Sequence, residues 1–221
     1  ITQHKAGLSV DANKNLVLTI GSVRGASDIV WTGATSSIWD FANTANFMLA
    51  GDAAQTPEIF VTGDIVTFGD QAANTAVNIS EDLSPDTLIV HSSKAYTFSG
   101  NGAIVAGSLV KQGSGTLTLS GDHSYTGGNY LKGGVVKVSA LSNENKATGN
   151  LGGVTSQASK FTMEGGATLQ TTAAVTNGSP IRFVGEEGGV ISNAADFNQN
   201  KAFSGTQLTK TGGGWLKTYV T

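Results

Sequence analysis

Two groups of neighbouring carboxylates are the residues of this sequence that could do acid–base chemistry. Glu81, Asp82 and Asp86 lie in the segment SEDLSPD, and Glu186 and Glu187 lie in the segment GEEGG. Hydrolysis of a glycosidic bond needs two carboxyl groups about 5–9.5 Å apart, one on each side of the bond. Because consecutive residues in a turn rarely converge in that way, we expect both groups to be solvated turns and predict no catalytic residue.

The three histidines, His4, His91 and His123, are the candidates for a general base or a metal ligand. No two of them have the spacing of a metal site. His123 stands between Asp122 and Ser124, the residue types of a catalytic triad, but a triad needs groups that converge from separate segments. We expect His91 on an outward face and His123 in a solvated loop, with no metal and no cofactor bound.

Aromatic residues that could contact a ligand concentrate in the first third of the chain, at Trp31, Trp39, Phe41, Phe47 and Phe60. Such rings could stack on a sugar, or they could fill the core where the structure is irregular. We favour the core, and Trp31, Trp39, Phe41 and Phe47 are the candidate binding residues of the alternative.

The composition excludes several classes of protein. The chain of 221 residues holds 30 glycines and no cysteine, 13% of its residues are charged, and its net charge is −3. Arginine occurs only at Arg24 and Arg182, so the basic surface that binds nucleic acid is missing. No apolar run approaches the roughly 18 residues of a membrane helix. We therefore expect no nucleic-acid partner and no membrane insertion by this segment.

Short runs of alternating apolar and polar residues recur along the chain, separated by Gly, Asn, Asp or Ser. Leu117 and Leu119, for example, alternate with Thr118 and Ser120, which predicts a strand with one buried face. The runs are often roughly 8–12 residues apart, so the sequence predicts an all-β fold. An antiparallel sandwich or barrel and a parallel β-helix both fit this pattern.

Two segments repeat one another and favour the β-helix. Leu109–Ser120 reads LVKQGSGTLTLS, and Leu208–Tyr219, which begins 99 residues later, reads LTKTGGGWLKTY. A leucine, a lysine, two glycines and a second leucine match in register. A solenoid, in which each coil stacks on the one before, produces such recurrence.

The first of these segments extends into LVKQGSGTLTLSGDHSYTGGNYLKGGVVKV, residues 109–138. It resembles the autotransporter-associated β-strand repeat, whose pattern runs Leu-x-Lys-x-Gly-x-Gly-Thr-Leu-x-Leu-Ser-Gly, then Tyr-Thr-Gly-Gly-Thr, then Gly-x-Leu-x-Val. The chain departs from this pattern at Asn129, where threonine is usual, and at Val136, where leucine is common. The resemblance implies a right-handed parallel β-helix. Looser similarities to the segment that often precedes the repeat lie at residues 30–40, 63–70 and 96–104.

We expect residues 1–221 to form one β-helix segment. If each coil takes roughly 20–25 residues, the chain makes about ten coils. Residues 1–60 would be a less regular, aromatic-rich part and residues 61–221 the regular coils, with the best repeat at 109–138 and a partial second copy at 208–221. Because that copy lacks its following strand, we expect the chain to be a truncated fragment of a longer rod.

The resemblance implies a non-enzymatic passenger or stalk segment of a Gram-negative protein, displayed at the cell surface or outer membrane or secreted. It would act in adhesion or surface contacts, with host or microbial glycans or proteins as partners, or with other solenoids through its edges. The alternative, by analogy with the fold alone, is a polysaccharide-binding or polysaccharide-cleaving β-helix module.

Overall fold

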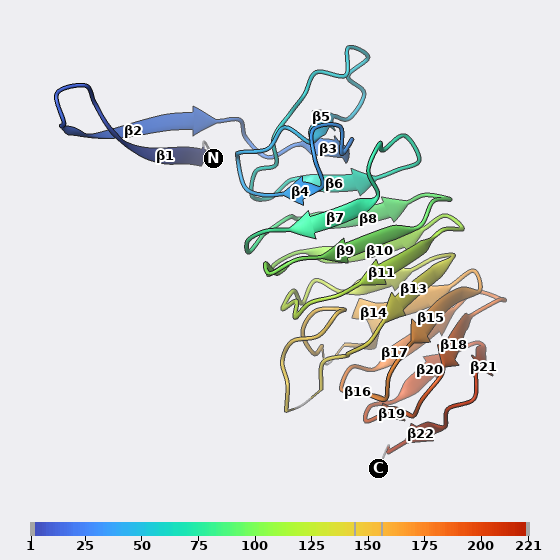
Figure 1. Ribbon diagram of the computed structural model, residues 1–221. Coiled ribbons are helices and arrows are strands. Elements are labelled where there is room, and N and C mark those ends of the chain that lie inside the picture. Colours follow the sequence, from blue (N-terminus) through green and yellow to red (C-terminus); the bar gives the residue numbers. More distant parts are fainter. Residues whose placement is uncertain (1–2, 144, 156, 220–221) are drawn as a thin grey trace.

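The computed structural model describes residues 3–143, 145–155 and 157–219, which form a parallel β-solenoid with a hairpin at its N-terminal end (Figure 1). In this part of the chain the only helical element is a 3-10 turn, Ala158–Lys160. The all-β prediction and the parallel β-helix architecture are therefore confirmed. Nothing helical among these residues is long and apolar enough to cross a bilayer.

Two long parallel sheets and a short third sheet run along the solenoid. The first face consists of β3 (Asp28–Trp31), β6 (Ile65–Phe68), β8 (Thr87–His91), β10 (Ser108–Gln112), β12 (Asn129–Leu131), β14 (Phe161–Glu164), β17 (Ile181–Val184) and β20 (Phe203–Gly205), with β5 (Phe47–Leu49) antiparallel to β3 at its edge. The second face consists of β4 (Ile38–Trp39), β7 (Ala76–Ile79), β9 (Tyr96–Ser99), β11 (Thr116–Leu119), β13 (Val135–Val138), β15 (Ala167–Thr171), β18 (Gly189–Asn193) and β21 (Leu208–Thr211). The third face consists of β16 (Val175–Asn177), β19 (Phe197–Gln199) and β22 (Leu216–Thr218).

The first face gives the number of coils. Nine strands form its sheet and eight of them are parallel, since β5 alone is antiparallel, so the seven steps between them are seven turns. The sequence predicted about ten. Most steps take 20–22 residues, as expected, but the step from Asp28 to Ile65 takes 37 residues and the step from Asn129 to Phe161 takes 32. The prediction of about ten coils was too high because these two excursions and the N-terminal hairpin contain residues that it had assigned to further coils.

Alternate side chains of each strand point into the solenoid and form its core. The predicted inward residues Leu117 and Leu119 are both buried, and so are Leu131, Val136 and Val138 on the neighbouring strands, which confirms the alternation. Fully burying one such side chain contributes roughly 1.5–3 kcal/mol. Because the inner strands of the two long faces have a parallel neighbour on both sides, these apolar side chains form a continuous column along the axis.

The hairpin of β1 (Gln3–Val10) and β2 (Leu16–Val23) is antiparallel and projects away from the coils (Figure 1). Its tip is closed by Asp11, whose Oδ1 accepts the backbone N–H groups of Asn13 and Asn15, both at 2.8 Å. One face of this ribbon carries large aliphatic side chains that are 60–69% exposed, namely Leu8, Val10, Leu16 and Leu18.

Candidate functional site

The turn from the first face to the second is built around a buried lysine and two glycines. In the coil of β10 and β11, the side chain of Lys111 points inward and is fully buried. Its Nζ donates to the carbonyl oxygens of Gln112 and Gly113, both at 3.0 Å, and to that of Gly133 in the next coil at 3.3 Å. Burial lowers the pKa of Lys111 to about 8. The ammonium group thus satisfies carbonyl groups that have turned out of the strand ladders.

The glycines of this corner have two separate roles. Gly113 has a φ of 76°, a left-handed conformation that glycine adopts without strain. A Cβ at Gly115 would lie 2.1 Å from the carbonyl oxygen of Lys94 in the preceding coil, so only glycine fits there. The Lys-x-Gly-x-Gly pattern therefore encodes a tight corner and its close contact with the coil beneath.

The second copy of the pattern builds the same corner at a different place on the circumference. Lys210 Nζ donates to the carbonyl oxygen of Gly212, which has a φ of 81°. A Cβ at Gly214 would lie 2.1 Å from the carbonyl oxygen of Ala195. This corner, however, joins β21 of the second face to β22 of the third face. The motif specifies a corner and not a fixed position around the rod.

A hollow of about 440 Å³ opens beside the first-to-second corner. It is lined by Thr67 and by the turns of three successive coils, at residues 69–71, 91–93 and 113–114. All three turns directly follow strands of the first face, so the parallel stacking of β6, β8 and β10 brings them together.

Asp70 is the charged residue of this hollow and is held in a fixed orientation. Its Oδ1 accepts hydrogen bonds from Ser92 Oγ, from Ser93 N at 2.8 Å and Ser93 Oγ at 3.1 Å, and from Lys94 N at 3.4 Å. The hydrogen bond from Ser92, followed by those from Ser93, lowers the pKa of Asp70 to about 2. All of these bonds reach Oδ1, and none of them uses Oδ2. Sequence reasoning missed Asp70, because its donors lie 22–24 residues away and the register alone pairs them.

The aromatic residues considered as a sugar-stacking surface lie mostly inside the first coils. Trp31, Trp39, Phe47 and Phe60 are at most 1% exposed. The ring centroids of Trp39 and Phe60 are 5.4 Å apart, and those of Trp31 and Phe47 are 5.1 Å apart. Phe41 is partly buried and packs against the same core. Their burial favours the core interpretation over stacking on a ligand.

The first acidic group lies next to these aromatics and stabilises the backbone of neighbouring segments. Glu81, Asp82, Phe41 and Phe60 line a hollow of about 200 Å³. Glu81 Oε1 accepts the backbone N–H of Phe41 at 2.9 Å, and Asp82 Oδ1 accepts that of Ala103 at 3.0 Å. Each of these two carboxylates therefore accepts a backbone N–H group of another segment.

The second acidic group is not brought near the first. Glu186 and Glu187 are exposed in the turn between β17 and β18, four steps of the first face beyond the coil that holds Asp86. Asp86 Oδ2 accepts a hydrogen bond from Thr87 Oγ1 at 3.1 Å. The structure therefore assembles no carboxylate pair from these two segments.

The expectation that His123 lies in a solvated loop is wrong. Its side chain is fully buried, because the excursion between β13 and β14 covers it: His123 N donates to the carbonyl oxygen of Gly149 at 3.0 Å, and Gly149 N donates back to that of His123 at 3.1 Å. Its Nδ1 accepts the backbone N–H of Ile104 at 3.1 Å, and desolvation lowers the pKa of His123. His91 is exposed at the end of β8, and His4 lies in β1. Within the described ranges no three His, Asp or Glu residues could hold a metal ion.

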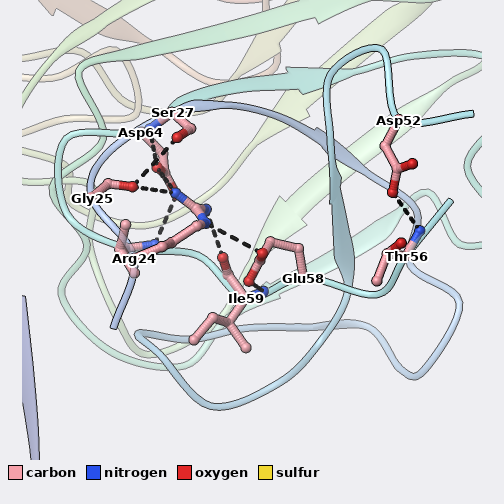
Figure 2. A network of polar contacts seen from close by, with 9 residues as sticks. Arg24, Gly25, Ser27, Asp52, Thr56, Glu58, Ile59 and Asp64 are labelled. Carbon is pink, nitrogen blue, oxygen red and sulfur yellow. Dashed lines mark hydrogen bonds and ion pairs between the residues drawn. The ribbon is translucent and has the colours of Figure 1, made fainter. Parts of the chain in front are cut away.

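Figure 2 shows a polar network where the hairpin joins the first coil. The two terminal nitrogens of Arg24 each donate to one carboxylate oxygen of Asp64 at 2.7 Å, and Nη2 also donates to the carbonyl of Ile59 at 2.8 Å. Arg24 Nε lies 3.6 Å from Glu58 Oε2. Asp64 is fully buried and also accepts the backbone N–H of Ser27 at 2.9 Å. We interpret the network as an anchor for the hairpin, since its acceptors are occupied by structural partners.

The fold and its corners define a parallel β-solenoid repeat protein. Residues 109–138, which run from β10 to β13, match the family model described as passenger-associated-transport-repeat. This match covers 30 of the 221 residues. No match was found among the curated proteins, and none among the solved structures. A β-solenoid that carries this repeat fits an autotransporter passenger β-helix repeat protein.

Proposed function

We propose that this chain is a non-enzymatic passenger or stalk segment, surface-exposed or secreted, whose outer faces make adhesive contacts. The observation that carries the proposal is a column of polar residues on the outside of the second face, all of them uncharged except one lysine. Register places its members side by side on six successive strands: Thr97, Thr118, Lys137, Gln170, Ser192 and Thr211. A long, regular polar surface of this kind suits repeated weak contacts with an extended partner.

The partners that fit this surface are glycans or proteins of host or microbial surfaces. The column offers hydroxyl and amide groups, which both donate and accept hydrogen bonds, and the ammonium group of Lys137, which donates them. Stacked coils hold these groups at the strand spacing of about 4.8 Å, so a polymer lying along the axis would meet the same chemistry at each coil. Association with another solenoid through the sheet edges is a second kind of contact that open edges permit.

The test is retention on an immobilised panel of host glycans and plant or microbial polysaccharides, scored together with the release of small products. We expect retention without products. Thr118→Glu places a charge in the middle of the column and should weaken retention, whereas Ser204→Glu, on the exposed outside of the first face, should not. Release of products, or no retention of a chain shown to be folded by circular dichroism, would contradict the proposal.

A further inference from the structure

The corner hollow has the chemistry of a site for a neutral, hydroxyl-rich ligand. Among the described residues that line it, none is a lysine, an arginine or a large apolar residue, and Asp70 is the single carboxylate. An anion would therefore face the negative charge of Asp70, an apolar molecule would find no large apolar side chain to pack against, and a metal ion would meet too few oxygen ligands. What remains is a mixture of hydroxyl, amide, imidazole and carboxylate groups, which matches ligands whose groups both donate and accept hydrogen bonds.

The carboxylate is already organised for binding. Because Oδ1 of Asp70 is held by Ser92, Ser93 and Lys94, the carboxylate has lost its rotational freedom before a ligand arrives. A ligand that uses Oδ2 does not bear the cost of ordering it, which is the usual gain from preorganisation. Hydrogen bonds to an ionised acceptor are roughly twice as strong as neutral ones.

The size of the hollow fits more than one sugar ring. It extends over three coils, and two strand spacings correspond to about 10 Å along the axis. Its volume of about 440 Å³ lies in the usual range of small-molecule sites. His91 and Gln71 both line the hollow and are exposed, so an imidazole ring and an amide accompany the carboxylate there.

We propose that the corner hollow is a binding site for a neutral saccharide, in which Asp70 Oδ2 accepts hydrogen bonds from ring hydroxyl groups. Gln71, His91 and the hydroxyl groups of Ser93 and Ser114 complete the site. This proposal rests on the adhesive function proposed above and adds to it a second, defined site with a named ligand class. A saccharide is held here at a corner of the rod, separate from the polar column of the second face.

The experiment is a titration of the ¹⁵N-labelled full chain with lactose, cellobiose and maltose, followed by amide chemical shifts. We expect millimolar binding of at least one sugar, typical of a few exposed hydrogen bonds, with shifts confined to residues 69–71, 91–93 and 113–114. Asp70→Asn should weaken binding about tenfold or more, because an amide oxygen is a weaker acceptor than a carboxylate. Gln71→Ala should weaken it several-fold, and Ser99→Ala, an exposed hydroxyl on the outside of β9, should leave it unchanged.

Several results would overturn the proposal. They are the absence of shifts at the hollow with all three sugars, shifts that lie elsewhere, or equal binding by wild type and Asp70→Asn. Gln71→Ala keeps the test decisive if Asp70→Asn lowers the melting temperature. Retention on the glycan panel that is lost in Thr118→Glu but kept in Asp70→Asn would leave the adhesive function standing and reject this site. Shifts produced by methylammonium but not by sugars would assign the hollow to a cation instead.

Discussion

Two segments with nearly the same sequence pattern end up with opposite burial. Leu16 and Leu18 in the hairpin belong to the run LVLT and are 69% and 60% exposed. Leu117 and Leu119 in the coils belong to the run LTLS and are 0% and 2% exposed. Alternation defines a strand and its two faces in both cases, but the coils above and below decide whether the apolar face is buried.

The neighbours of the two segments explain the difference. β11 lies between β9 and β13, so its inward side chains pack against others on both sides and against the opposite face. β2 has β1 as its single described partner. A two-stranded ribbon alone is marginally stable in water. The Arg24–Asp64 pair at its base provides the attachment that packing does not.

The largest effect should come from truncating matched leucines in the two segments. Leu117→Ala removes a fully buried side chain from the column and should lower the free energy of unfolding by about 2–5 kcal/mol. Leu18→Ala should change it by about 0.5 kcal/mol or less, because its side chain is already in water. Chemical denaturation followed by circular dichroism measures both values, and equal effects would break the comparison.

A second pair of variants tests whether the corners hold the coils together. Gly115→Ala forces a Cβ against the backbone of Lys94 and should cost about 1–3 kcal/mol. The control is Gly213→Ala, in the equivalent corner of the second copy, where a Cβ meets nothing within 4 Å. We expect its melting temperature to match that of the wild type, and tolerance of Gly115→Ala would refute the close-contact role.

The anchor of the hairpin can be loosened by one substitution at Asp64, which directly precedes β6. Asp64→Asn removes the charge that both terminal nitrogens of Arg24 contact, which should cost about 1–3 kcal/mol locally. Trypsin should then cleave after Arg24 faster than in the wild type, since cleavage tracks local opening. Asp52→Asn changes an exposed turn carboxylate in the neighbouring loop (Figure 2) and should leave the rate unchanged. Equal cleavage of the two variants would show that the pair does not anchor the hairpin.

The smallest effect concerns pH. The pKa of His123 in the folded chain lies below its ordinary value of 6.5, because burial disfavours the imidazolium. Between that value and the folded pKa the unfolded chain binds a proton that the folded chain does not, so stability should fall as pH falls through this window. Melting temperatures measured from about pH 7 to about pH 5 should decline less steeply in His123→Asn than in His91→Asn. Parallel slopes in the two variants would contradict this role for His123.

Local patterns made much of the fold predictable. Leu117, Val136 and their equivalents alternate as a strand requires, and the Lys-x-Gly-x-Gly corner repeats in recognisable form at Lys210. The coil number was not predictable in the same way. The steps that lead to Ile65 and Phe161 include long excursions, and no residue type in the sequence indicates them. The reason is that an excursion and a short strand with its turn have the same polar, glycine-rich composition.

The candidate site depended on register, which sequence patterns do not contain. Asp70 and Ser92 are separated by a full coil, and their contact follows from the pairing of β6 with β8. From the sequence alone, Lys111 would be placed on the surface because it is charged. Its burial is explained by the corner carbonyl groups to which it donates, and only the structure shows these. His123 was misplaced because the segment that covers it, around Gly149, belongs to an excursion.

Amide hydrogen exchange measured by mass spectrometry tests the central contrast most directly. Protection reports how often each segment opens. We predict slow exchange in β8 to β13, where every strand has two parallel neighbours, and fast exchange in β1 and β2. Protection of the hairpin equal to that of the coils, or rapid exchange within the coils, would contradict the account.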